Sequence, residues 1–221
     1  MSGNVKIISI NENIFAGNDR AAEEVRAYLK ERGVYMINVM SAPDSGKTTL
    51  LTALVNRLKD RIRIAEMDVD IESTLDAQRV ADATGVRAIQ IHNNGLCHID
   101  ADMTFRAIKE FGVEDTDLLI LENIGNLVCP AEFDTGANKN IMLLSVPEGD
   151  DKPLKYPLMF TVSDVVLITK TDTMDFFNFD MEKAKERIRR LHPGVTIIPV
   201  SAKTGEGMEE LTDYLLAEMK N

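Results

Sequence analysis

The sequence predicts an α/β fold, a doubly wound and mostly parallel sheet with helices on both faces, and three observations lead to it. Apolar runs alternate with helical patterns along most of the chain. Runs such as 118–121 and 165–168 are continuously apolar, which is typical of parallel strands covered on both faces. A Gly-Lys-Thr loop at residues 46–48 separates the first strand from the next helix. Ligands of such sheets bind at the carboxyl ends of the strands.

The individual elements follow from hydrophobic periodicity. In the first helix, Ala21, Val25 and Leu29 recur on one side, and Gly33 ends it. The expected helices cover residues 13–32, 50–58, 75–83, 103–111, 181–191 and 208–219. The expected strands cover residues 34–40, 61–67, 87–91, 117–122, 140–145, 164–169 and 195–200.

The domain organisation is simple. We expect a helical appendage at residues 1–33 and a P-loop domain at 34–221, which together make a single structural domain. The longer loops, 123–138 and 147–157, are where functional residues are expected.

Composition narrows the class of protein. The chain has 221 residues and a net charge of −11, which argues against nonspecific binding to nucleic acid or to an anionic membrane. No segment approaches the length of a transmembrane helix, and the N-terminus lacks a secretory pattern. A cytoplasmic location is therefore expected.

The segment from Ser41 to Leu50, Ser-Ala-Pro-Asp-Ser-Gly-Lys-Thr-Thr-Leu, predicts a phosphate-binding loop. Gly46 would let the backbone approach a phosphate, Lys47 would reach the β- and γ-phosphates, and Thr48 would offer its hydroxyl to Mg²⁺. Two positions depart from the general pattern. Ser41 replaces a glycine, and Asp44 stands where a small residue is expected, although aspartate tolerates left-handed backbone angles. The alternative is an ordinary strand–turn–helix junction capped by Ser45 or Asp44.

Carboxylates follow two other strands. Glu122 ends an apolar strand and is placed to hold Mg²⁺ directly or through water, while Gly125 could give a backbone N–H to the γ-phosphate. Asp68 and Asp70, at the end of the second strand, are further candidates for Mg²⁺ or for positioning water.

Two later segments indicate guanine rather than adenine. Thr169-Lys170-Thr171-Asp172 resembles the Asn-Lys-x-Asp element of GTPases, in which the aspartate accepts from two donors that adenine does not present. Ser201-Ala202-Lys203 resembles the Ser-Ala-Lys element that presents backbone N–H to guanine O6. Each follows a strand, so GTP is favoured over ATP.

The chain contains only two cysteines, Cys97 and Cys129, and His98 adjoins the first. Two thiolates and an imidazole suit Zn²⁺ or Ni²⁺ without distinguishing them. Three ligands leave a four-coordinate ion one short, which suggests an exchangeable site or ligands shared across a dimer. Spacing alone favours two buried thiols and an unrelated histidine, whereas the closeness of Cys129 to Glu122 and Gly125 favours a metal that nucleotide could switch.

These motifs together resemble the HypB-type GTPases that assist nickel insertion into [NiFe]-hydrogenase, over nearly the whole chain. The similar stretches are the P-loop, Cys-His-Ile-Asp at 97–100, Glu-Asn-Ile-Gly-Asn-Leu-Val-Cys-Pro-Ala-Glu-Phe-Asp at 122–134 and Glu-Gly-Asp-Asp-Lys-Pro-Leu-Lys-Tyr-Pro at 148–157. Urease-maturation GTPases, with a Cys-Pro-His motif, are a poorer match.

The resemblance implies a GTPase whose subunits dimerise on binding nucleotide and whose partners are a hydrogenase accessory protein and the hydrogenase large-subunit precursor. It implies metal ligands at Cys97, His98 and Cys129, and guanine contacts at Lys170 and Asp172. By the same resemblance, phosphates are held by Ser45, Gly46, Lys47, Thr48 and Thr49, and Mg²⁺ and the attacking water by Asp70 and Glu122.

The departures from the family pattern leave alternatives open. Asp44 and Thr169, at family glycine and asparagine positions, predict weaker or less selective nucleotide binding. No Cys-rich or His-rich N-terminal extension is seen, so the central metal site is expected to act alone. A nucleotide-dependent metal-binding scaffold with little turnover is the second hypothesis. A small-molecule P-loop kinase is the third, and the two guanine elements argue against it.

Overall fold

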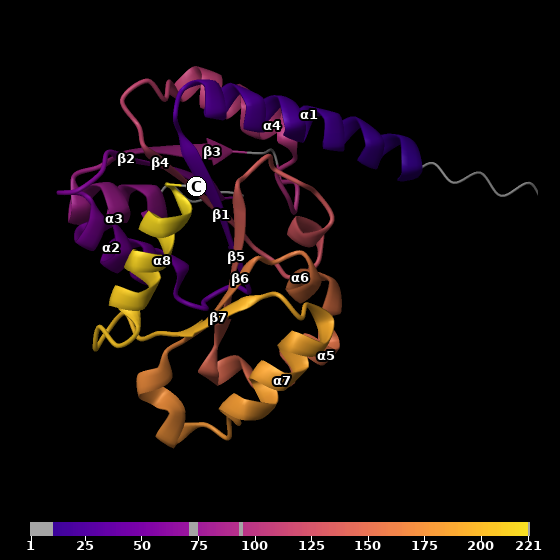
Figure 1. Ribbon diagram of the computed structural model, residues 1–221, viewed down its shortest axis with the longest axis vertical. Coiled ribbons are helices and arrows are strands. Elements are labelled where there is room, and N and C mark those ends of the chain that lie inside the picture. The colour runs from indigo at the N-terminus through magenta and orange to yellow at the C-terminus, as the bar shows by residue number, and fades with distance from the viewer. Residues whose placement is uncertain (1–10, 71–74, 93–94, 221) are drawn as a thin grey trace, which may run out of the picture.

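A computed structural model describes residues 11–70, 75–92 and 95–220, with the backbone alone at 11–15, 70 and 75–76 (Figure 1). Its centre is a seven-stranded sheet in the order β3-β2-β4-β1-β5-β6-β7, and every neighbouring pair is parallel. The strands are β1 (Tyr35–Ser41), β2 (Ile64–Asp70), β3 (Arg87–His92), β4 (Leu118–Gly125), β5 (Lys139–Ser145), β6 (Val165–Thr169) and β7 (Thr196–Pro199). The predicted fold class is confirmed.

The helices alternate with the strands as predicted. They are α1 (Asn11–Glu31), α2 (Lys47–Leu58), α3 (Leu75–Thr84), α4 (Ala101–Phe111), α5 (Lys152–Lys155), α6 (Pro157–Thr161), α7 (Met181–Leu191) and α8 (Met208–Glu218). The described residues also form three short 3₁₀ helices, η1 (Cys129–Ala131), η2 (Val146–Glu148) and η3 (Thr171–Phe176).

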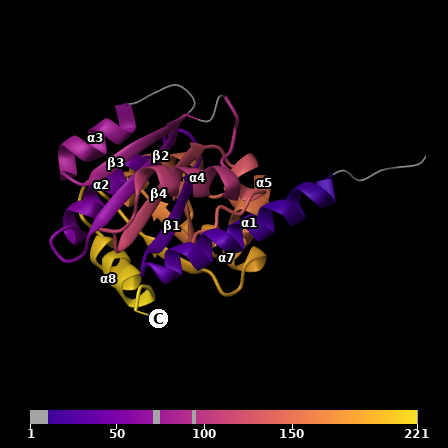
Figure 2. The same cartoon turned by 90° about the horizontal axis from the view of Figure 1, so that it is seen from above.

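The helices form two layers. α2, α3 and α8 lie together on one face of the sheet, and α1, α4, α6 and α7 lie on the other (Figure 1, Figure 2). The first face buries leucines of α2 and α8 against β1, β4 and β5, and the second buries α1 and α4 against β2 and β4. Because both faces are covered, β4 and β6 are buried almost throughout, which accounts for the unbroken apolar runs 118–121 and 165–168.

Several boundaries differ from the expectation. α2 begins at Lys47 rather than residue 50, because Gly46 in a left-handed conformation starts the helix within the Gly-Lys-Thr loop. β4 continues past Glu122 to Gly125, where the strand still pairs with Ser41. The expected loop at 147–157 contains the one-turn helix α5, whose first turn includes a proline that is compatible with a helix start.

The N-terminal helix α1 is packed into the fold. Ala22, Val25 and Leu29 are buried in the same apolar cluster as β2 and β4. The ring of Tyr28 meets Phe105 of α4 edge-on, with ring centroids 5.2 Å apart. α1 is therefore a structural layer over the sheet, and the division at residue 33 stays a prediction from the sequence.

Candidate functional site

The loop between β1 and α2 lines a cavity of about 850 Å³ at the carboxyl end of the sheet. Lys47 reaches back across the loop, and its ammonium donates a hydrogen bond to Ser41 Oγ at 3.0 Å. Ser41, which departs from the general motif, thus provides an acceptor that orients the lysine. Ser45 is 2% exposed, and its hydroxyl has no hydrogen-bond partner among the residues that the structure describes. A buried, unsatisfied hydroxyl of this kind fits a polar ligand such as a phosphate oxygen.

Asp44 and Lys170 both have left-handed backbones, with φ of 57° and 59°. The prediction that aspartate would tolerate such a conformation in the loop is confirmed. The Lys170 ammonium donates to the backbone oxygen of Asp44 at 3.0 Å. A Cβ at Gly46 would lie 3.3 Å from Lys170 Cε, so the lysine stem crosses the loop where glycine leaves room.

Two of the predicted Mg²⁺ residues are in contact. The Thr48 hydroxyl donates to Glu122 Oε1 at 3.1 Å, and Glu122 is 3% exposed. Asp68 lies opposite Glu122 in the β2–β4 register and is also buried. Asp70 ends β2, but its side chain lies outside the described residues. A hydroxyl beside carboxylate oxygens is a hard-oxygen donor set that suits Mg²⁺.

The predicted base-binding residues other than Ser201 line a second, smaller cavity of about 290 Å³ that shares Ser45, Gly46 and Thr49 with the first. Asp172 Oδ1 accepts from the Ser201 hydroxyl at 2.7 Å, and Lys203 Nζ lies 3.8 Å from Asp172 Oδ2. Lys170 and Ala202 also line this cavity. The two guanine-type elements, 29 residues apart, therefore meet at one carboxylate.

Thr169 occupies the asparagine position of the guanine element and is buried. Its hydroxyl donates to the backbone oxygen of Ser45 at 3.4 Å. The threonine therefore joins the base-binding loop to the phosphate loop, although the bond is long. The expectation that Thr169 makes nucleotide binding weaker or less selective stays a prediction.

The two cysteines, from separate loops, come together. Cys97 is exposed, and a hydrogen bond with Cys129 is the main cause that holds the pKa of the Cys97 thiol above its ordinary value. His98 Nδ1 lies 3.9 Å from Cys97 Sγ, and its ring stacks on Phe133 with centroids 3.9 Å apart. Within the described part of the chain, no group of three or more His, Cys, Asp or Glu side chains is arranged to hold a metal ion. The structure thus brings together a thiol pair with an imidazole beside it, and the role of the three as ligands stays a prediction.

The acidic loop that resembles the family element has structural contacts. Glu148 Oε2 accepts from the backbone and the hydroxyl of Ser145, which forms a capping box at η2. Asp150 pairs with Arg187 of α7 and accepts from the backbone N–H of Asp180. These bonds fasten the loop to α7.

The sequence analysis missed several residues that reach the candidate sites only through tertiary contacts. Arg79 of α3 lines the larger cavity, but an arginine on an amphipathic helix carries no motif. Asn18 of α1 and Asn126 were also missed, and both bond to the loops that carry the cysteines.

No helix among the described residues is long and apolar enough to span a bilayer. The hydrogenase maturation factor HypB of Escherichia coli K12 is 41% identical over 210 residues, which cover 95% of this chain and 72% of that protein. The hydrogenase/urease maturation factor HypB of Helicobacter pylori J99 is 43% identical over 220 residues, covering 97% and 89%. A crystal structure of HypB from Helicobacter pylori in complex with nickel matches with a TM-score of 0.86 at 41% identity, covering 92% of this chain and 95% of that one. The family model described as the CobW/HypB/UreG nucleotide-binding domain matches residues 35–199. The chain belongs to this nucleotide-binding family and, within it, to the HypB hydrogenase maturation factors.

Proposed function

We propose that this protein binds and hydrolyses GTP with Mg²⁺ and delivers nickel to a [NiFe]-hydrogenase precursor. The observation that carries the proposal is the position of β4 and the loop after it. Glu122 on β4 contacts the phosphate loop through Thr48, and Cys129, in the segment after the strand, meets Cys97. One continuous segment therefore reaches both a nucleotide site and a thiol pair.

The phosphate loop supplies the groups that hydrolysis needs. Lys47 and the backbone N–H groups at the start of α2 would bind the β- and γ-phosphates, and Thr48 and Glu122 would hold Mg²⁺ with Asp70. Bound Mg²⁺ would neutralise the charge that develops on the phosphates. Attack of water on the γ-phosphorus breaks its bond to the bridging oxygen and yields GDP and phosphate, with Glu122 and Asp70 orienting the water.

The base is guanine in this proposal. Asp172, held by Ser201 and Lys203, would accept from guanine N1–H and the exocyclic amine, and Lys170 would lie along the ring. The backbone N–H groups of Ser201, Ala202 and Lys203 are the donors for O6.

Nickel is the cargo of the proposed reaction. Cys97, Cys129 and His98 offer thiolate and imidazole ligands, which suit Ni²⁺ and also Zn²⁺. The related Helicobacter structure described as a nickel complex supports nickel. An incomplete ligand set in one chain suits an ion that must be passed on.

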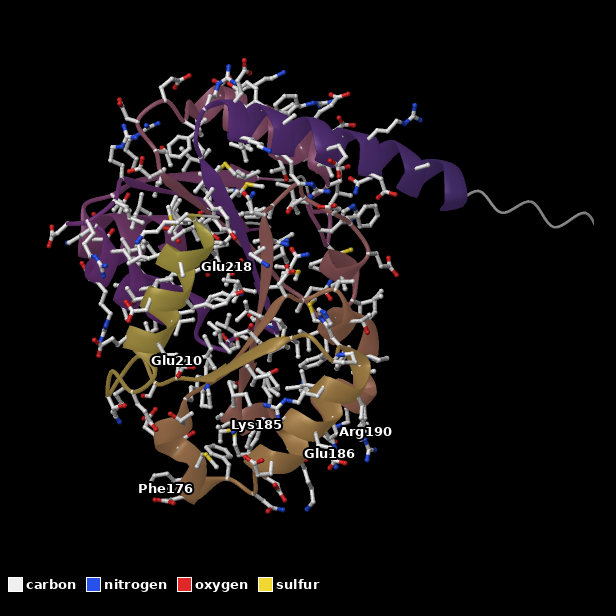
Figure 3. The ribbon with its side chains drawn as sticks, viewed as in Figure 1. Phe176, Lys185, Glu186, Arg190, Glu210 and Glu218 are labelled. Atoms are coloured by element: carbon white, nitrogen blue, oxygen red, sulfur yellow. The ribbon has the colours of Figure 1, made fainter. Side chains whose placement is uncertain are left out.

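The partners follow from the family. We propose a homodimer that forms with nucleotide in the cytoplasm and acts with a hydrogenase accessory protein. Apolar side chains beside both sites favour an interface. Val128, next to Cys129, is 51% exposed, and Phe176, which follows the base-binding loop and projects from η3 (Figure 3), is 83% exposed. A urease precursor is the alternative recipient, since the Helicobacter pylori relative is named for both enzymes.

The rate of GTP turnover by the Lys47→Ala variant tests the nucleotide-hydrolysis part of the proposal. We expect turnover to fall by at least roughly 100-fold, because the lysine stabilises charge on the transferred phosphoryl group. Lys183→Ala, at an exposed lysine of α7, is the control and is expected to turn over like wild type. Equal GTP turnover by Lys47→Ala and by the wild type would refute the assignment of this loop as a P-loop.

A metal-binding scaffold with little turnover is the second candidate, motivated by Asp44 and Thr169. Both residues fit the site, since Asp44 adopts the required conformation and Thr169 bonds to Ser45. GTP turnover measured beside nickel binding separates the candidates: nickel binding without turnover favours the scaffold.

A further inference from the structure

Asn18 of α1 connects the two segments that carry the cysteines. Its side-chain amide donates to the backbone oxygen of Asp134 at 2.9 Å, and its amide oxygen accepts from the backbone N–H of Ala101 at 2.9 Å. Asp134 lies five residues after Cys129, and Ala101 begins α4 just after Cys97 and His98. A single side chain thus bonds to both segments.

The bonded groups are parts of rigid elements. Asp100 caps α4 by accepting from the backbone N–H of Met103 at 2.8 Å, so Ala101 is fixed in the first turn of the helix. The amide oxygen of Asn18 satisfies the Ala101 N–H, one of the N–H groups that a helix start leaves without an internal partner. The contact therefore joins α1 to the beginning of α4.

The other segment is held to α1 by further contacts. Arg26 forms a two-pronged ion pair with Asp134, with Nη2–Oδ2 at 2.6 Å and Nη1–Oδ1 at 3.0 Å. A Cβ at Gly136 would lie 2.4 Å from Val25 Cβ, so the loop lies directly on α1. Asn18 is therefore attached to a helix that is already fixed against this loop.

Other contacts also join the two segments. His98 stacks on Phe133, and Asn126 donates to the backbone oxygen of Cys97 at 3.4 Å. Groups that do not touch the metal but hydrogen-bond to its ligands, or to the segments that carry them, fix the placement of those ligands and commonly affect metal affinity. From these contacts we propose that Asn18 is a positioning residue for a metal held by Cys97 and Cys129, so that α1 belongs to the metal site although it supplies no ligand. This inference rests on the proposed metal role.

The test is a Ni²⁺ titration of the full chain against a chromophoric chelator, with the thiolate-to-nickel charge-transfer band recorded. Asn18→Ala removes both bonds. Asn18→Asp keeps an acceptor for Ala101 but loses the donor to Asp134, and it provides a second variant if the first folds poorly. Asp19→Ala, at the exposed neighbouring residue of α1, is the matched control. Thermal denaturation and GDP binding establish that each variant is folded.

We expect both Asn18 variants to bind Ni²⁺ roughly tenfold more weakly, with a changed charge-transfer band, and Asp19→Ala to match wild type. Asn18→Ala should cause no further loss in a Cys129→Ser background, because the bridge matters only where both segments supply ligands. A purely structural role would lower the melting temperature without these changes.

If the nickel affinity and the charge-transfer band were unchanged in both Asn18 variants, this inference would be overturned, and the proposed metal role would stand. An equal loss of affinity in the Cys129→Ser background would also overturn it. If Cys129→Ser itself bound Ni²⁺ as wild type does, the proposed metal role would fail, and this inference would fail with it. The single variants and the Cys129→Ser background thus distinguish the two failures.

Discussion

Gly125 lies directly against Pro43 of the phosphate loop. A Cβ at residue 125 would come 3.0 Å from Pro43 Cα and 3.1 Å from Pro43 N. Gly125 ends β4, and Cys129 follows four residues later. A shift of the phosphate loop must therefore move the start of the segment that carries one thiol, which gives nucleotide a direct route to the thiol pair.

Gly125→Ala should displace the phosphate loop, because backbone atoms cannot give way as a flexible side chain can. We expect a loss of about 1–3 kcal/mol in the free energy of unfolding and roughly tenfold weaker GDP binding. Chemical denaturation and calorimetric titration with GDP measure the two effects. Gly17→Ala, where a Cβ meets nothing within 4 Å, is the control and should leave GDP affinity unchanged. GDP affinity equal to wild type in Gly125→Ala would show that the contact does not link the two loops.

Asp172→Asn should change the preferred base. Xanthine keeps the N1–H donor of guanine but carries a carbonyl in place of the exocyclic amine. An amide at 172 can accept from N1–H and donate to that carbonyl, so the variant should prefer XTP and lose GTP affinity. Competition binding with GTP and XTP measures the preference, with Asp175→Asn, at an exposed residue nearby, as the control. An unchanged preference for GTP would place the base elsewhere.

Thr169→Val should weaken nucleotide binding through the loss of one hydrogen bond. The two side chains have nearly the same shape, and the variant leaves the Ser45 oxygen without the hydroxyl at 3.4 Å. A lost hydrogen bond of about 1 kcal/mol corresponds to roughly fivefold weaker GDP binding. Ser163→Ala removes another buried hydroxyl, which bonds to Met159, and is the control for stability. GDP affinity that does not change in Thr169→Val would mean that this bond is too long to matter.

The ion pair between Asp117 and Arg63 should make part of the folding stability sensitive to acid. A hydrogen bond from Arg63 holds the pKa of the Asp117 carboxyl below its ordinary value. A lowered carboxyl pKa stabilises the fold above the pKa of the unfolded chain, about 3.9, and this stabilisation is lost as the pH falls through the folded-state pKa. Asp117→Asn should therefore melt below wild type at pH 7, and the two melting temperatures should begin to converge as the pH falls below about 4.

Melting curves between pH 3 and pH 7 measure this difference. Asp115→Asn is the matched control, since Asp115 is 3.8 Å from the same arginine and its side chain is 86% exposed. It should track wild type at every pH. A gap between Asp117→Asn and wild type that did not narrow at all between pH 7 and pH 3 would assign the stability to packing instead.

The parts of the molecule that the sequence predicts are those encoded locally. The strand runs, the left-handed position at Asp44 and the order of the two guanine elements depend on neighbouring residues. The contacts of Asn18 join residues 116 and 83 positions apart, and periodicity carries no information about them. The bond between Lys47 and Ser41 was missed for a different reason, because Ser41 was judged against a general motif and not against this loop. The meeting of Cys97 and Cys129 depends on how two loops pack, so residue spacing left it open.

The most direct test of the account is the Ni²⁺ affinity of the protein loaded with GDP and with a non-hydrolysable GTP analogue. The account predicts Ni²⁺ affinities that differ by roughly fivefold or more between the two nucleotide states. By linkage, adding Ni²⁺ should change the ratio of the two nucleotide affinities by the same factor. The difference should disappear in Cys129→Ser. The same Ni²⁺ affinity in both nucleotide states would contradict it.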